Sequence, residues 1–306
     1  MSSPLVRLLS GLLLLSCIGT LHAQSPTPQP SAPPIKIPPM PGVRQVFDVP
    51  YVTGGHEAQK LDLYIPENTK SALPLLVYIH GGGWAKGDKK WFPGKGFTTH
   101  GYVVASLNYR LSQDAVFPAQ IEDCKAAIRF LRAHASEYKI QGDRVGVWGD
   151  SAGGHLVALL GTTGDIRDFD TGANLDQPSK VQCVVDWYGP TDFLHIGDKP
   201  DPARDTPGSA VGKLLGGTIR DNPDKARRAS PIYYVNKDTA PFLIMHGDND
   251  KAVPLQQSQI FEEALKKAGI VYKLVIIPGA KHADPVFRTE SNMSTISQFL
   301  DTHLKQ

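Results

Sequence analysis

Short apolar segments alternate with amphipathic segments along most of this chain, and this alternation constrains its fold more than any other feature. The apolar segments are residues 61–65, 73–79, 102–107, 145–148, 181–187, 241–245 and 271–277. Several of them are continuous apolar runs, which are typical of strands buried on both faces of a sheet. Apolar residues at helical spacing predict helices at residues 118–138, 155–160, 255–268 and 291–304. The sequence therefore predicts an α/β fold with a mostly parallel central sheet and helices on both faces.

One segment interrupts this alternation. Residues 190–235 are rich in Pro, Asp and Gly and contain only weak helical patterns. In open α/β sheets, ligands bind at the carboxyl ends of the strands. We therefore predict a small insertion over that edge, which is either a lid that shapes a ligand pocket or a passive excursion of the chain.

The first 42 residues differ in composition from the rest of the chain. A positively charged start, the apolar run at residues 8–20 and the small residue Ala23 predict a secretory signal peptide over residues 1–23. A lipid-attachment site at Cys17 is the alternative. Residues 24–42 are Pro-rich and predict an extended linker. We expect the remaining domain to be secreted or periplasmic.

Composition argues against several classes of protein. The formal net charge of +2 is nearly balanced and Lys and Arg are scattered, so we expect no nucleic-acid partner. No apolar run in the body of the chain reaches the roughly 18 residues of a membrane span. Cys124 and Cys183 both lie in apolar patterns, which favours buried free thiols, although the sequence leaves their pairing open.

Residues 149–154 read GDSAGG and fit the pattern G-x-S-x-G between a predicted strand and a predicted helix. In that setting, small residues let the chain turn sharply and hold the Ser151 hydroxyl exposed in a strained conformation. A glycine-rich turn with a capping serine is the plainer alternative. Because a serine hydroxyl is a poor nucleophile without a base, the prediction requires a histidine and a carboxylate elsewhere.

A second glycine cluster, HGGGW at residues 80–84, follows a predicted strand. Consecutive glycines allow backbone N–H groups to approach a ligand closely. We predict that the N–H groups of Gly82, Gly83 and Ala152 surround an oxyanion, and that His80 holds the loop by hydrogen bonding. The spacing of phosphate-binding glycine motifs is absent.

The base is expected late in the chain, if the order is Ser…Asp…His. His282 follows the last predicted strand on a glycine-containing loop and is the best candidate; the other histidines after the serine are His155, His195, His246 and His303. Asp250, on the loop after the preceding strand, is predicted to orient the imidazole, and Asp248 to brace that loop. A calcium site at these two aspartates lacks the other ligands of a loop motif, and no zinc-ligand spacing is present.

These motifs resemble the α/β-hydrolase superfamily over residues 43–306, and HGGGW, GDSAGG, HGDND with a following VP, and GAKH occur in its order. The HGGG and GDSAG blocks resemble hormone-sensitive-lipase-type esterases, whereas HGGGW-x-x-GDK and the LDLY strand resemble secreted bacterial esterases of the acetyl-xylan and feruloyl esterase group. The resemblance implies a catalytic domain with Ser151 as nucleophile, Asp250 as acid and His282 as base. Trp84 departs from the Phe or Tyr that is usual in the hormone-sensitive-lipase type.

We therefore expect a serine carboxylesterase that works through an acyl-enzyme without a metal or cofactor. The expected substrate is a small-molecule or polysaccharide-linked ester, such as an acetyl or feruloyl ester, with Trp84 and Tyr188 lining the pocket. Similar HGG-x-W loops occur in kynurenine formamidases, so an amidase, peptidase or formamidase is the alternative on this scaffold. A catalytically inactive secreted binding domain is the alternative of another class.

Overall fold

The computed structural model describes residues 38–196 and 205–305, which belong to one compact unit. The predicted signal peptide, the Cys17 alternative and residues 24–37 of the predicted linker lie outside the described residues. Residues 197–204 of the predicted insertion also lie outside them. Within the described ranges, no helix combines the length and the apolar character that crossing a membrane requires.

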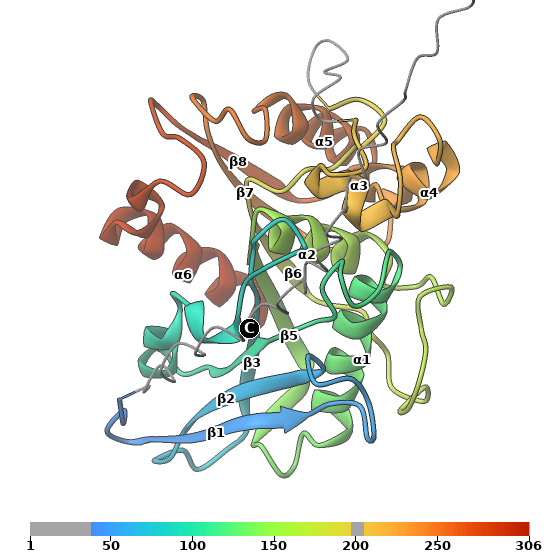
Figure 1. Cartoon of the computed structure of the whole chain (residues 1–306). Helices are drawn as coiled ribbons and strands as arrows, with labels where there is room; N and C mark the ends of the chain where they lie inside the picture. The colour runs from blue at the N-terminus through green and yellow to red at the C-terminus, as the bar shows by residue number, and fades with distance from the viewer. Residues whose placement is uncertain (1–37, 197–204, 306) are drawn as a thin grey trace, which may run out of the picture. The chain divides into compact units, whose positions relative to one another are not determined.

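An eight-stranded sheet forms the centre of the domain, with the strand order β1-β2-β4-β3-β5-β6-β7-β8 (Figure 1). β2 pairs antiparallel with β1 and with β4, and all the other neighbouring pairs are parallel. The strands are β1 Val43–Pro50, β2 Lys60–Pro66, β3 Leu73–Ile79, β4 Val103–Leu107, β5 Ile140–Asp150, β6 Cys183–Trp187, β7 Phe242–Gly247 and β8 Tyr272–Ile277. The predicted mostly parallel sheet is confirmed.

Two strands differ from the sequence prediction. β1 lies at the edge of the sheet and mixes partly buried with exposed residues, so it lacks the continuous apolar run that identifies a buried strand. β5 begins at Ile140, which pairs with Leu73 of β3, and not at Val145 as predicted. Both differences arise from strand pairing, which local hydrophobicity does not reveal.

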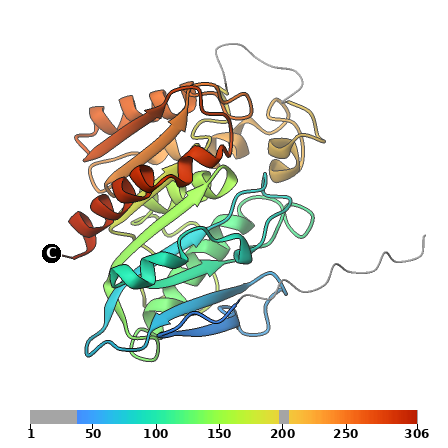
Figure 2. The ribbon, with the colours of Figure 1, turned by 90° about the vertical axis from the view of Figure 1, so that its left-hand side faces the viewer.

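Helices cover both faces of the sheet. α1 (Ala119–Ala133), α2 (Ala152–Thr162) and α5 (Gln256–Lys267) contribute apolar side chains to the core on one face. α6 (Glu290–Leu304) packs into the core on the other face, and Figure 2 shows it lying across the strands. The predicted layers are confirmed, although α1 ends before residue 138 because the chain turns at residues 134–139 to enter β5.

The described part of the insertion contains short helices. They are α3 (Ala210–Leu215), α4 (Pro223–Arg228) and the 3-10 helix η3 (Pro231–Tyr234). α3 begins directly against the HGGGW loop, because a Cβ added to Gly83 would lie 3.3 Å from the Cβ of Ala210. The insertion therefore contacts the loop that was predicted to bind an oxyanion.

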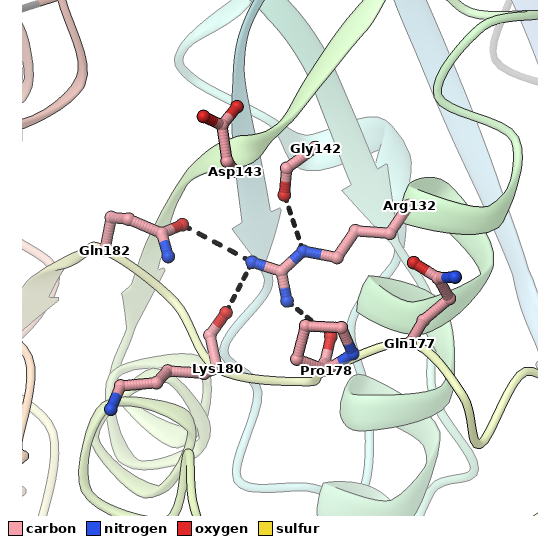
Figure 3. A pocket seen from close by; sticks show the side chains of 7 residues that line it. All are labelled: Arg132, Gly142, Asp143, Gln177, Pro178, Lys180 and Gln182. Carbon is pink, nitrogen blue, oxygen red and sulfur yellow. Dashed lines mark hydrogen bonds between the residues drawn. The ribbon is translucent and has the colours of Figure 1, made fainter.

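A surface cavity of about 320 Å³ lies at the amino ends of β5 and β6, at the opposite end of β5 from Ser151. Figure 3 shows Arg132 of α1 reaching across it. The guanidinium donates hydrogen bonds to the backbone oxygens of Gly142 and Lys180, both at 2.6 Å, and of Pro178. Burial lowers the pKa of Arg132 to about 10. Because the N–H groups of its guanidinium donate to backbone carbonyls, Arg132 ties the loop before β6 to α1 and has a structural role.

The two cysteines of the described domain are buried and unbridged, as their apolar surroundings predict. Cys124 on α1 packs in the core on one face of the sheet, and Cys183 on β6 packs in the core on the other face. The sheet thus separates the two thiols, and burial raises the pKa of each.

Candidate active site

Ser151 occupies the sharp turn between β5 and α2. Its backbone has φ 52° and ψ −115°, a conformation that a non-glycine residue adopts only where the surrounding structure holds it. The neighbouring glycines leave no room for a side chain: a Cβ at Gly149 would lie 2.3 Å from the oxygen of Gly153, and a Cβ at Gly153 would lie 2.0 Å from the oxygen of Ile79. The close packing of α2 on the sheet therefore requires the small residues of GDSAGG.

An imidazole and a carboxylate meet the Ser151 hydroxyl at this edge of the sheet. The Nε2 atom of His282 lies 2.9 Å from Ser151 Oγ, and its Nδ1 atom lies 2.6 Å from Asp250 Oδ2. A carboxylate oxygen only accepts hydrogen bonds, so Nδ1 carries the proton and Nε2 is left to accept the proton of the hydroxyl. The structure thus brings together the three residues that the sequence predicted as catalytic.

Asp250 is buried on the loop after β7. Its Oδ1 atom accepts hydrogen bonds from the N–H groups of Ala252 and Val253, at 2.8 and 2.9 Å. Burial alone would raise the pKa of Asp250, but hydrogen bonds from His246 and His282 outweigh this and hold the pKa well below its ordinary value. Asp250 therefore stays ionised beside the imidazole.

Asp248 braces the loop that carries the base. Its Oδ1 atom accepts a hydrogen bond of 2.6 Å from the N–H group of Gly279, three residues before His282 in the sequence. Asp248 and Asp250 thus have different partners, in agreement with the bracing role predicted for Asp248.

His246 is a second histidine beside Asp250, and the sequence did not predict this contact. It is buried at the end of β7, with Nδ1 2.7 Å from Ser258 Oγ and Nε2 2.9 Å from the oxygen of Val253. The same Nε2 atom lies 3.5 Å from Asp250 Oδ2. The available signal was its position four residues before Asp250 in the HGDND motif.

The HGGGW loop turns tightly beside the nucleophile. Gly82 and Gly83 have φ angles of 109° and 61°, which glycine adopts without strain, and a Cβ on Gly82 would lie 2.1 Å from the oxygen of Lys86. Among the described residues, no hydrogen bond uses the N–H groups of Gly82, Gly83 or Ala152. These donors are available for the role that the sequence predicted.

Asp150 ties the HGGGW loop to the nucleophile turn. Its Oδ1 atom accepts hydrogen bonds from the N–H group of Gly81, at 3.0 Å, and from the hydroxyl of Tyr78. His80 is buried and stacks on Tyr109 with ring centroids 4.6 Å apart, and its Nδ1 atom lies 2.8 Å from the oxygen of Gly81. Burial lowers the pKa of His80. His80 thus holds the loop, and Asp150 is a further support that the sequence did not predict.

The two residues predicted to line the substrate pocket lie in different surroundings. The ring of Tyr188 contacts the base, with centroids 4.8 Å from His282 and 4.6 Å from Phe287. Trp84 is only 3% exposed, and its Nε1–H group donates to Nδ1 of His155 at 3.2 Å. Tyr188 therefore adjoins the catalytic centre, whereas the Trp84 indole is buried between the loop and α2.

Known proteins are similar to this chain both in fold and in sequence. The model of the BD-FAE family matches residues 61–265, which is well over half of the chain. This chain belongs to the BD-FAE family. This BD-FAE chain is similar in sequence to proteins named as esterases and in structure to a carbohydrate esterase. The α/β-hydrolase fold that the sequence predicts is confirmed.

One relative in sequence and two solved structures illustrate what this BD-FAE chain is similar to. The probable carboxylic ester hydrolase LipM of Mycobacterium tuberculosis is 31% identical over 242 residues, which are 74% of this chain and 54% of LipM. The chain thus spans about half the length of this relative. The structure of a truncated form of a carbohydrate esterase from gut microbiota has a TM-score of 0.83 and 31% identity, over 89% of this chain and 100% of that one. An acetyl ester-xyloside bifunctional hydrolase from Caldicellulosiruptor lactoaceticus has a TM-score of 0.64 and 25% identity, over 79% and 87%.

Proposed function

We propose that this protein is a serine carboxylic ester hydrolase and that Ser151, His282 and Asp250 form its catalytic triad. The observation that carries the proposal is the continuous hydrogen-bonded chain from the hydroxyl through the imidazole to the carboxylate, with distances of 2.9 and 2.6 Å. This arrangement activates a serine for acyl transfer. The name of LipM, a probable carboxylic ester hydrolase, supports the choice of an ester substrate.

In the first step, Ser151 Oγ attacks the carbonyl carbon of the ester while Nε2 of His282 takes the hydroxyl proton. Asp250 holds the imidazole in the required tautomer and stabilises the imidazolium that forms. His282 then donates its proton to the departing alcohol, and the acyl group remains bonded to Ser151 Oγ. In the second step, His282 takes a proton from water, the water oxygen attacks the acyl carbon, and the acid leaves as Oγ regains its proton.

The negative charge that develops on the carbonyl oxygen is stabilised by backbone donors. In this proposal the N–H groups of Gly82, Gly83 and Ala152 point at that oxygen, and Ala152 adds the positive end of the α2 dipole because it is the first residue of the helix. One such donor contributes about 3 kcal/mol to the stabilisation of the transition state.

We propose further that the substrate is an acetyl or feruloyl ester on plant polysaccharide. The supporting observations are the names of two structural neighbours, a carbohydrate esterase and an acetyl ester-xyloside bifunctional hydrolase. The predicted signal peptide and Pro-rich linker fit a secreted or periplasmic protein that meets a polymer outside the cytoplasm.

The proposal is tested with the wild-type protein and the Ser151→Ala variant on a panel of esters. The panel varies acyl length with p-nitrophenyl esters and includes acetylated xylan and methyl ferulate; the anilide matched to the best ester tests the amidase alternative. We expect ester hydrolysis by the wild type, and a loss of about 10⁴-fold or more in kcat for Ser151→Ala with the fold intact. Ser294→Ala, which changes an exposed serine on α6, is the control and keeps full activity.

Labelling by a fluorophosphonate probe separates the remaining alternatives. We expect the wild type to be labelled and Ser151→Ala to resist labelling, because the probe reacts only with an activated hydroxyl. A folded wild-type protein that neither reacts with the probe nor cleaves any ester would overturn the proposal in favour of an inactive binding domain. Faster cleavage of the anilide than of the ester would favour an amidase.

A further inference from the structure

A second histidine of the nucleophile helix links three parts of the site. His155 lies on α2, four residues after Ser151, and is completely buried. Its Nδ1 atom lies 3.2 Å from Nε1 of Trp84, the last residue of the HGGGW loop. Its Nε2 atom lies 2.6 Å from the backbone oxygen of Ala229, which follows α4 in the insertion. One imidazole thus connects α2, the HGGGW loop and the insertion.

These two contacts specify one form of the imidazole of His155. An indole N–H group only donates and a carbonyl oxygen only accepts, so Nδ1 must accept from Trp84 and Nε2–H must donate to Ala229. The imidazolium would have two donors and would face the N–H group of Trp84 with a proton. Burial also lowers the pKa of His155 to about 4, which keeps the ring neutral at ordinary pH.

Trp84 is held by contacts of its ring and of its backbone. Its backbone has φ 55°, outside the range in which a large side chain is relaxed. Its ring packs edge-on against His155 and against Phe193 of the insertion, with centroids 5.2 and 5.6 Å apart. Its backbone oxygen accepts hydrogen bonds from N–H and Oγ of Ser112, at 2.7 and 3.1 Å. The indole is therefore held at its ring and the loop at its backbone.

Trp84 is bonded directly to Gly83, whose N–H group is one of the donors assigned to the oxyanion. A shift of the indole that is transmitted to the backbone of Trp84 would move the Gly83–Trp84 peptide plane, and with it the glycine turn that begins at Gly82. Displacement of a catalytic group by about 1 Å can lower the rate of an enzyme by about 100-fold. His155 does not touch the reacting atoms, and its direct side-chain contact with the HGGGW loop is the one to Trp84.

We propose that His155 is a positioning residue that fixes the oxyanion loop by accepting a hydrogen bond from the indole of Trp84, and that its bond to Ala229 makes the loop geometry depend on the insertion. This inference rests on the proposed function. It assigns the buried Trp84 a role in holding the loop, in place of the pocket-lining role predicted from the sequence.

Four variants test the proposal. His155→Gln keeps an acceptor and a donor that can replace Nδ1 and Nε2–H, whereas His155→Leu removes both. Trp84→Phe keeps a ring but removes the indole N–H group, and it tests the same contact if His155→Leu does not fold. Leu160→Ala is the matched control, because it opens a cavity in the same buried helix without altering the contact.

Kinetics and inhibitor affinity distinguish positioning from packing. We expect His155→Leu and Trp84→Phe to lower kcat on a p-nitrophenyl ester by about 10- to 100-fold, with KM changed far less. We expect the affinity for an arylboronic acid, which places an oxygen among the oxyanion donors, to fall by a similar factor. His155→Gln regains most of both, and Leu160→Ala loses stability but keeps wild-type kcat. Equal kcat and boronate affinity in wild type, His155→Leu and Trp84→Phe would overturn the proposal.

Hydrogen exchange of the Trp84 indole N–H group, followed by NMR, gives a readout that does not require activity. We expect slow exchange in the wild type and in His155→Gln, and exchange at least about ten times faster in His155→Leu; similar exchange rates in all three would count against the proposal. If the wild-type protein cleaves no ester, the proposed function fails, while the exchange rates still decide whether His155 holds the loop.

Discussion

Among single residues, Asp250 is a buried carboxylate that contacts two histidines and two backbone N–H groups. Asp250→Asn keeps the size of the side chain but removes the charge that stabilises the imidazolium of His282. We expect kcat to fall by about 10³- to 10⁴-fold. The free energy of unfolding at neutral pH should fall as well, because the lowered pKa of Asp250 means that its charge stabilises the folded state. The measurement is kcat on the best ester of the panel, together with a urea unfolding curve.

Asp248→Asn is the matched control for this variant. The amide oxygen of the new side chain can still accept the N–H group of Gly279, so the brace on the His282 loop persists and kcat stays within a few-fold of wild type. If Asp250→Asn retained as much activity as Asp248→Asn, Asp250 would not be the carboxylate that orients the base.

The residues of the triad were predictable for a reason of topology. In a parallel sheet, the loops after successive strands emerge at one edge, so Ser151, Asp250 and His282 could be placed together without any knowledge of their contacts. The supporting contacts were not predictable in this way. Asp150 meets Gly81 across 69 residues of sequence and Trp84 meets His155 across 71, and which way each side chain turns depends on packing that no local pattern encodes.

Among the elements, the GDK sequence after HGGGW has a structural explanation. Lys89, in the 3-10 helix η1 (Lys89–Trp91), is 2% exposed. Its Nζ atom lies 2.6 Å from Asp62 Oδ1 on β2 and 2.7 Å from Asp48 Oδ1 on β1. The segment that follows the HGGGW loop is thus fixed to the antiparallel edge of the sheet by a buried cation.

Lys89→Met leaves Asp62 buried without its cation. We expect a loss of about 3–5 kcal/mol in the free energy of unfolding, because an uncompensated buried charge is far more costly than the loss of an exposed pair. Lys60→Met is the control: its pair with Glu57 has the same 2.6 Å distance, but Glu57 is 85% exposed, and such pairs contribute up to about 1 kcal/mol. Urea unfolding of both variants measures the two losses in free energy of unfolding. Equal losses would show that the buried pair of Lys89 contributes no more to stability than the exposed pair of Lys60.

For the molecule as a whole, the central strands carry ionisable groups whose burial couples stability to pH. Asp186 lies on β6 and is completely buried. Its Oδ1 atom accepts a hydrogen bond of 2.9 Å from the N–H group of Gly189, whereas its Oδ2 atom has no partner among the described residues. Burial raises the pKa of Asp186 from its ordinary value near 3.8 to about 6, so the folded state favours the protonated carboxyl.

The sign of the resulting pH dependence follows from this shift. Below pH 4 the carboxyl is protonated in both states, and its contribution to stability is fully present. As the pH rises toward and through 6, the Asp186 carboxyl ionises readily in the unfolded chain, whereas in the folded protein its ionisation places a charge in a buried site. The contribution to stability is therefore lost. Asp186→Asn cannot ionise. We therefore expect its stability relative to wild type to increase between pH 4 and pH 7, by on the order of 2–3 kcal/mol at most, and then to stay constant.

Urea unfolding of wild type and Asp186→Asn at several pH values measures this difference directly. Taking the difference removes the titration of all other groups, including that of His155, whose lowered pKa acts in the opposite direction by making the protein less stable as the pH falls from 6.5 toward 4. Asp224→Asn, at an exposed position, shows how much of the effect comes from changing the net charge alone. If the difference in the free energy of unfolding between wild type and Asp186→Asn stayed level from pH 4 to pH 7, the carboxyl of Asp186 would ionise in the folded protein as easily as in the unfolded chain. Oδ2 would then need a hydrogen-bond donor in the folded protein.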